Sequence, residues 1–193
     1  MKPELEEWIT SNGSVVKEEK NFTVYELGGE VKYEDARRKI RQVTLGHENS
    51  AEVKTVLLLG ETGAGKSTFF NVFLNMVFGV TSNDKLRVRL KSPAEQSTGP
   101  VQTTYVTDLT IYHQDGMPHP YNYRIIDTPG LDCAAGRGMQ DYGELCIKNY
   151  LAKNDLIKHI NSVGIIWKSS NIRLTENDRD VLSKIEEDGW SIF

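Results

Sequence analysis

Runs of apolar residues separated by polar or glycine-rich segments divide most of the chain into alternating strands and helices. Lys54 to Leu59 is apolar at consecutive positions and predicts a strand buried on both faces, as in a parallel sheet. A glycine-rich turn follows, and we predict a helix from about Lys66 to Phe78. Ser162 to Lys168 (SVGIIWK) predicts another buried strand.

The middle of the chain predicts an antiparallel hairpin. Tyr105 to His113 is rich in β-branched and aromatic residues, and Tyr121 to Ile126 continues the pattern after a short loop. One further strand is possible at Lys85 to Leu90, inside an otherwise polar segment. Helices are predicted from Gln140 to about Ala152 and from Glu176 to Glu187. Strands that alternate with helices predict an α/β fold with a mostly parallel sheet and helices on both faces.

The first fifty residues differ from this pattern. Asn21 to Leu27 predicts a short strand, and Tyr33 to Val43 predicts a charged amphipathic helix. A polar linker, His47 to Glu52, ends the segment. We therefore expect an N-terminal appendage over residues 1–50 and a main domain over residues 51–193. The basic residues of the predicted helix favour a solvated face over a site for an acidic partner.

Composition limits the function classes. A chain of 193 residues can bury one proper core, and its net charge of −4 argues against a general nucleic-acid binder. The longest apolar stretch, Phe69 to Val80, contains two Asn and is too short for a transmembrane segment. Cys133 and Cys146 lack metal-type spacing, and the N-terminus lacks the apolar core of a signal peptide. We expect a cytoplasmic protein.

The turn after the first buried strand carries the main candidate chemistry. Gly60 to Ser67 reads GETGAGKS and fits the P-loop pattern G-x-x-x-x-G-K-[ST] at every fixed position. Its glycines allow a tight turn whose N–H groups point inward at an anion, and the following helix directs its positive end at the same place. The predicted nucleotide-contacting residues are Gly60, Glu61, Thr62, Gly63, Ala64, Gly65, Lys66, Ser67 and Thr68.

A second element is required for a complete phosphate site. Asp127 ends the predicted strand Tyr121 to Ile126 and begins the sequence Asp-Thr-Pro-Gly. An acidic residue at this place holds Mg²⁺ through water, and Ser67 offers its hydroxyl to the same ion. Ser67 and Asp127 are therefore the candidate metal ligands. Gly130 could bring its N–H to a γ-phosphate, because no side chain intervenes.

Together, GETGAGKST and IIDTPGL resemble the translation-factor-related class of P-loop GTPases. The later segment Arg173 to Asp178 (RLTEND) is similar to that of the immunity-associated (avirulence-induced) GTPases, which group with septins and chloroplast import-receptor GTPases. The resemblance covers about residues 53–187 and implies GTP and Mg²⁺ as ligands. The base-reading motif of these families, Asn/Thr-Lys-x-Asp, is not present, so guanine specificity is implied by resemblance alone. We expect a G domain that is truncated at its C-terminus.

The same resemblance implies switch residues. A threonine should close over Mg²⁺, and Thr103 is the first candidate, with Thr98 and Thr104 close to it. Thr103 and Gly130 are thus the candidate catalytic residues. Leu131 stands where Ras-like enzymes place a water-orienting Gln, which implies slow hydrolysis. Some related GTPases hydrolyse only after pairing, and a homodimer across the nucleotide face is therefore possible here.

Three functions stay open from the sequence. The leading hypothesis is a GTP-binding switch or assembly module with Mg²⁺-dependent, slow hydrolysis. The second is an ATP-using P-loop enzyme, against which the absence of an apolar run ending in Asp-Glu counts. The third is a non-catalytic nucleotide-binding fragment that binds partners through an exposed sheet edge or through the N-terminal appendage. The sequence names no protein partner.

Overall fold

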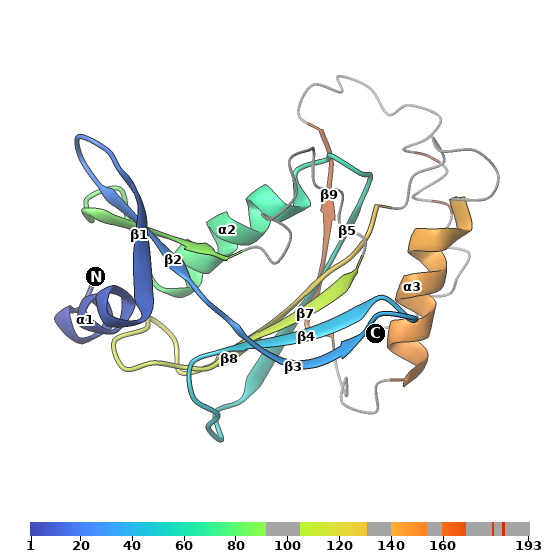
Figure 1. The fold of residues 1–193 in the computed structure, drawn as a ribbon, viewed down its shortest axis with the longest axis horizontal. Helices are drawn as coiled ribbons and strands as arrows, with labels where there is room; N and C mark the ends of the chain where they lie inside the picture. Colours follow the sequence, from blue (N-terminus) through green and yellow to red (C-terminus); the bar gives the residue numbers. More distant parts are fainter. Residues whose placement is uncertain (92–104, 131–139, 154–159, 169–178, 180–182, 184–193) are drawn as a thin grey trace.

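A six-stranded sheet forms the centre of the computed structural model, which describes residues 1–91, 105–130, 140–153, 160–168, 179 and 183 (Figure 1). Its strands, in spatial order, are β3 (Glu30–Asp35), β4 (Ile40–Leu45), β7 (Val106–Ile111), β8 (Asn122–Asp127), β5 (Val53–Gly60) and β9 (Ser162–Ile166). The pairs β4/β7, β8/β5 and β5/β9 are parallel, whereas β3/β4 and β7/β8 are antiparallel. The predicted mostly parallel sheet and the predicted hairpin are both confirmed.

Helices cover both faces of this sheet because side chains alternate along its central strand. Leu58 of β5 packs in one core with α2 (Lys66–Val77), whereas Leu57 and Leu59 pack in the other core with α3 (Gln140–Lys153). Figure 1 shows the two helices on opposite sides of the sheet. The predicted α/β fold is therefore confirmed, as are the helices expected after the glycine-rich turn and from Gln140 onward.

A smaller three-stranded sheet contributes to the hydrophobic core that contains α2. It contains β1 (Gly13–Glu18), β2 (Thr23–Leu27) and β6 (Leu86–Leu90), in which β2 and β6 are parallel. The strands predicted near Asn21 to Leu27 and at Lys85 to Leu90 are confirmed. An additional helix, α1 (Pro3–Asn12), was not predicted; its Leu5 and Ile9 are fully buried in the core that α2 also enters. The N-terminal segment is thus packed on the body of the domain.

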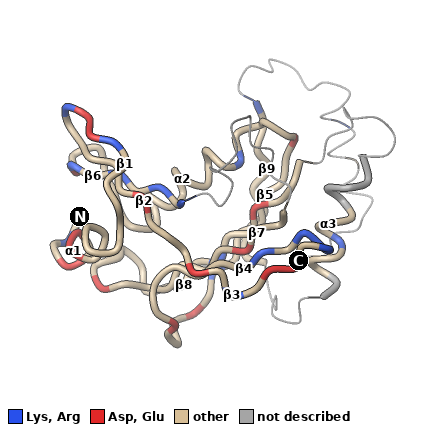
Figure 2. Tube along the Cα trace, in the orientation of Figure 1, with Lys and Arg blue, Asp and Glu red and all other residues tan. Residues whose placement is uncertain are grey.

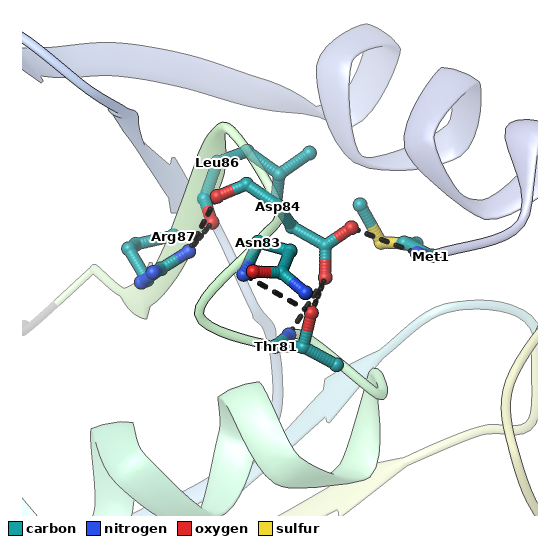
Figure 3. A network of polar contacts seen from close by, with 6 residues as sticks. All are labelled: Met1, Thr81, Asn83, Asp84, Leu86 and Arg87. Atoms are coloured by element: carbon teal, nitrogen blue, oxygen red, sulfur yellow. Dashed lines mark hydrogen bonds and ion pairs between the residues drawn. The ribbon is translucent and has the colours of Figure 1, made fainter.

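A polar network anchors the start of the chain to the turn before β6 (Figure 3). The Met1 ammonium group donates a 2.8 Å hydrogen bond to Asp84 Oδ1. The other carboxylate oxygen of Asp84 accepts hydrogen bonds from the N–H and hydroxyl of Thr81 at 2.7 and 2.8 Å. These donors, the ammonium group first, lower the pKa of Asp84 to about 2. The carboxylate therefore stays ionised and holds the turn in place.

The helix predicted from Tyr33 to Val43 is wrong, because this stretch forms β3, a turn and β4. Asp35 nucleates the turn by accepting hydrogen bonds from the N–H groups of Arg37 and Arg38 at 3.0 and 2.9 Å. Lys39 then adopts a left-handed conformation (φ 57°). Pairing of β4 with β7 over six residues overrides the local helical pattern.

Two basic residues of this hairpin, Arg38 and Arg41, form ion pairs within it. Arg38 contacts Asp35 at 3.1 Å and Arg41 contacts Glu34 at 2.9 Å. Figure 2 shows Lys and Arg beside Asp and Glu along this part of the chain. The guanidinium of Arg41 also lies 4.6 Å from the ring centre of Tyr105. Glu34 and Asp35 therefore balance the charges of two of the four basic residues in the stretch that was predicted to be helical.

The described residues leave two other sequence-based predictions untested. The predicted helix from Glu176 to Glu187 lies almost entirely outside them. The division of the chain at residue 50 remains a prediction, although β4 lies in the central sheet. Among the helices in the described ranges, none has the length and apolar character needed to cross a membrane.

Candidate functional site

The loop between β5 and α2 is shaped by glycines that other residues could not replace. Gly60 has a φ of 146°, and a Cβ there would strike the carbonyl group of Ile166 in β9. Gly65, directly before α2, has a left-handed φ of 101°. The backbone can therefore turn within a few residues from the end of the strand into the helix. This is the conformation that the P-loop pattern predicts.

Lys66 begins α2 and points back into this loop. Its ammonium group donates hydrogen bonds of 3.0 and 2.8 Å to the carbonyl oxygens of Gly60 and Glu61. Only 6% of the Lys66 residue surface is exposed, although the next two residues, Ser67 and Thr68, are exposed. The loop thus encloses a positive charge at the N-terminal end of a helix, where the helix dipole also favours an anion.

Asp127 brings a buried carboxylate to the same edge of the sheet. It is the last residue of β8 and pairs in register with Leu58 of β5. Burial raises the pKa of Asp127 to about 6, while the positive charge of Lys66 acts in the opposite direction. The Oδ1 atom of Asp127 has no hydrogen-bond partner among the described residues. A buried carboxylate oxygen without a donor fits a cation such as Mg²⁺, which prefers oxygen ligands.

The segment after Asp127 is tied directly to the loop. The hydroxyl group of Thr128 donates a 2.7 Å hydrogen bond to the carbonyl oxygen of Leu58, and Thr128 is fully buried. Gly130 lies against Thr62 so closely that a Cβ on Gly130 would strike the backbone and hydroxyl of Thr62. The two sequence motifs are therefore in contact at Gly130 and Thr62.

A buried ion pair links β7 and β8 close to the strand end that carries Asp127. Arg124 of β8 binds both carboxylate oxygens of Asp108 of β7, with Nε and Oδ1 2.8 Å apart. Gln42 of β4 donates to the same carboxylate at 3.2 Å, and Tyr150 of α3 lies 3.3 Å from the guanidinium. Burial raises the pKa of the Tyr150 hydroxyl. Three strands and one helix are linked in this way.

Sequence reasoning missed Thr128 and this ion pair. A weak signal for the pair was available, because Arg124 interrupts the otherwise apolar end of a predicted strand. The partner Asp108 is 16 residues away and was not identifiable from spacing. Thr128 stands inside the Asp-Thr-Pro-Gly motif, but the motif itself does not show where its hydroxyl group points.

The structure brings together most of the predicted site residues. Those from Gly60 to Thr68 form the loop and the start of α2, with Asp127 and Gly130 beside it. Their roles in nucleotide binding stay predictions. The remaining candidates lie outside the described residues: Thr98, Thr103, Thr104 and Leu131.

Comparison with protein families gives one result. Residues 55–192 match the model of the family described as 50S ribosome-binding GTPase. Neither the curated proteins nor the solved structures that were searched contain a significant match. The matched region begins in β5, includes the loop and continues through Asp127 and β9. It covers most of the chain.

Proposed function

The chain belongs to the 50S ribosome-binding GTPase family, and on this premise we propose that it is a nucleotide-dependent switch or assembly module that binds GTP with Mg²⁺ and hydrolyses it slowly. One observation carries the proposal. Lys66 lies inside the P-loop while the buried carboxylate of Asp127 stands at the adjacent strand end with an unpartnered oxygen. An enclosed cation beside a buried carboxylate suits a magnesium–phosphate ligand.

The loop residues supply binding and charge. Lys66 would exchange the carbonyl oxygens of Gly60 and Glu61 for phosphate oxygens, which are stronger acceptors because they are charged. The N–H groups in the first turn of α2 would add further donors. Burial of Lys66 keeps its charge close to the ligand and away from bulk water.

Ser67 and Asp127 would hold Mg²⁺, which supplies neutralisation of the phosphate charge when it is bound. The exposed Ser67 hydroxyl group is accessible at the first turn of α2, and Asp127 faces the loop from β8. Gly130 would offer its N–H to the terminal phosphate. Its contact with Thr62 supports this role, because it brings the backbone of the second motif against the P-loop.

Slow hydrolysis and the switch role rest on residues outside the described ranges. Leu131 has no hydrogen-bonding group with which to orient a water molecule, and Thr103 is the threonine proposed to close over Mg²⁺. Membership of the immunity-associated and septin-like group, pairing of two copies across the nucleotide face and a cytoplasmic location belong to the same proposal. The RLTEND segment supports the first of these.

Nucleotide titration tests the proposal. GTP and ATP are titrated into the protein by calorimetry, with and without Mg²⁺, and the same measurement is made on Lys66→Ala. We expect GTP to bind more tightly than ATP, Mg²⁺ to strengthen binding, and Lys66→Ala to abolish it. Lys54→Ala is the control, because Lys54 is a surface lysine paired with Glu52 at the opposite end of the same strand. Equal or absent binding of the two nucleotides would contradict the proposal.

Turnover separates the alternatives. The rate of phosphate release from GTP should be slow. If paired copies are the active species, the rate per protein molecule should increase with protein concentration. Faster release from ATP than from GTP would favour an ATP-using enzyme. Tight GTP binding without any release would favour the non-catalytic binding module.

A further inference from the structure

A second lysine lies over the P-loop from the side opposite Asp127. Lys168 follows β9, and its Cε atom is 4.0 Å from the position that a Cβ on Gly63 would take. Its ammonium nitrogen lies 3.8 Å from the carboxylate of Glu61. The Lys168 side chain is 41% exposed, whereas that of Glu61 is 10% exposed. The lysine therefore covers the loop while its charged end still reaches solvent.

The order of the strands determines which part of a ligand each residue can meet. β8 and β9 are the two neighbours of β5, and all three run parallel. Asp127 ends β8 and Gly130 comes three residues later, so both approach the P-loop from one side. Lys168 follows β9 and approaches from the other. When the terminal phosphate lies beside Asp127, a nucleoside that extends across the loop toward β9 comes next to Lys168.

We propose that Lys168 contacts the ribose and base of the bound nucleotide and is a positioning residue for its nucleoside half. This inference rests on the proposed function, because it requires a nucleotide in the loop. A lysine suits the task. Its aliphatic stem can pack on a flat ring while its three N–H donors reach ribose or base oxygens.

Glu61 holds Lys168 in position. An ion pair at 3.8 Å with a partly exposed lysine contributes little stability, so its exchange for a ligand oxygen costs little. Glu61 stands between two lysines, because its carbonyl oxygen accepts a hydrogen bond from Lys66. The Glu61 carboxylate therefore keeps the ammonium group of Lys168 beside the loop, apart from the position of the Lys66 ammonium group.

Three ligands that share phosphates but differ in the nucleoside test the assignment. A non-hydrolysable GTP analogue, GDP and inorganic tripolyphosphate are each titrated with Mg²⁺ into wild type and Lys168→Ala. We expect Lys168→Ala to weaken the GTP analogue and GDP by the same factor, about tenfold for a lost charge-assisted contact. Tripolyphosphate binding should not change. Lys168→Arg should recover most of the affinity, and Lys54→Ala should behave as wild type.

Other outcomes overturn the inference in distinguishable ways. Unchanged binding of the GTP analogue and GDP by Lys168→Ala would show that the lysine makes no ligand contact. A loss confined to the GTP analogue, or shared by tripolyphosphate, would show that it acts on the phosphates. If wild type itself binds no GTP, the proposed function fails and this inference fails with it. Thermal unfolding without ligand verifies that each variant folds. If Lys168→Ala does not fold, Lys168→Gln takes its place.

Discussion

The hydroxyl group of Thr128 donates a 2.7 Å hydrogen bond to the carbonyl oxygen of Leu58, and this bond joins the Asp-Thr-Pro-Gly segment to the P-loop strand. Both residues are fully buried. Water therefore cannot replace the bond if it is lost. The relative position of the two motifs depends on a contact between residues 70 positions apart in the chain.

Replacement of Thr128 by Val should destabilise the protein. Valine keeps the shape of threonine but removes the donor, and a buried carbonyl that loses its partner costs about 1–3 kcal/mol. Urea unfolding should show this decrease in the free energy of unfolding. Thr128→Ser keeps the hydroxyl group and should lose less, so a serine variant as unstable as the valine variant would show that packing matters more than the bond.

Replacement of Gly130 by Ala should separate the two motifs. The added methyl group has no room against Thr62, and a forced fit of this kind costs about 1–3 kcal/mol. We expect weaker GTP binding in calorimetry together with a lower melting temperature. Gly28→Ala is a matched control, because a Cβ there meets nothing within 4 Å. Wild-type affinity in Gly130→Ala would show that the segment can move away without consequence for the ligand.

Asp108→Asn should be among the most destabilising single changes in the central sheet. It leaves the guanidinium of Arg124 buried without its carboxylate, which costs about 3–5 kcal/mol in comparable buried pairs. Chemical unfolding measures the effect. Glu34→Gln removes the exposed partner of Arg41 and should cost at most about 1 kcal/mol. A loss in Asp108→Asn as small as in Glu34→Gln would contradict the role given to the pair.

The sequence predicted most of the strands because their signal is local. A buried central strand such as Lys54 to Leu59 has to be apolar on both faces, and the structure agrees. The stretch from Tyr33 to Val43 failed for the opposite reason. Its spacing fits a helix, whereas the pairing of β4 with β7, more than sixty residues later, favours a hairpin. No window of neighbouring residues contains that partner.

The same difference between local and long-range determinants applies to the candidate site. The P-loop and Asp127 were predictable, because each motif is a few residues long and its backbone geometry follows from its glycines and its place at a strand end. The contacts that hold the motifs together were not. Thr128 with Leu58, Gly130 with Thr62 and Lys168 with Glu61 are pairs formed by sheet register. Register depends on the whole fold.

Asp127→Asn should stabilise the ligand-free protein at neutral pH. Burial raises the pKa of Asp127 from 3.8 to about 6, so the folded state favours the protonated carboxyl. Stability from this group is present below pH 3.8 and is lost as the pH rises through about 6. Such a shift corresponds to about 3 kcal/mol at neutral pH. Asparagine cannot ionise and does not incur this loss.

Thermal unfolding of both proteins between pH 4 and pH 7.5 measures the effect. The melting temperatures should be similar at pH 4, and Asp127→Asn should melt higher at pH 7.5, because other groups titrate alike in both. Addition of Mg²⁺ and GTP should reverse the order, since the ionised carboxylate gains a cation that asparagine holds poorly. A variant that is less stable than wild type at pH 7.5 without ligand would show that the protein itself stabilises the charged carboxylate.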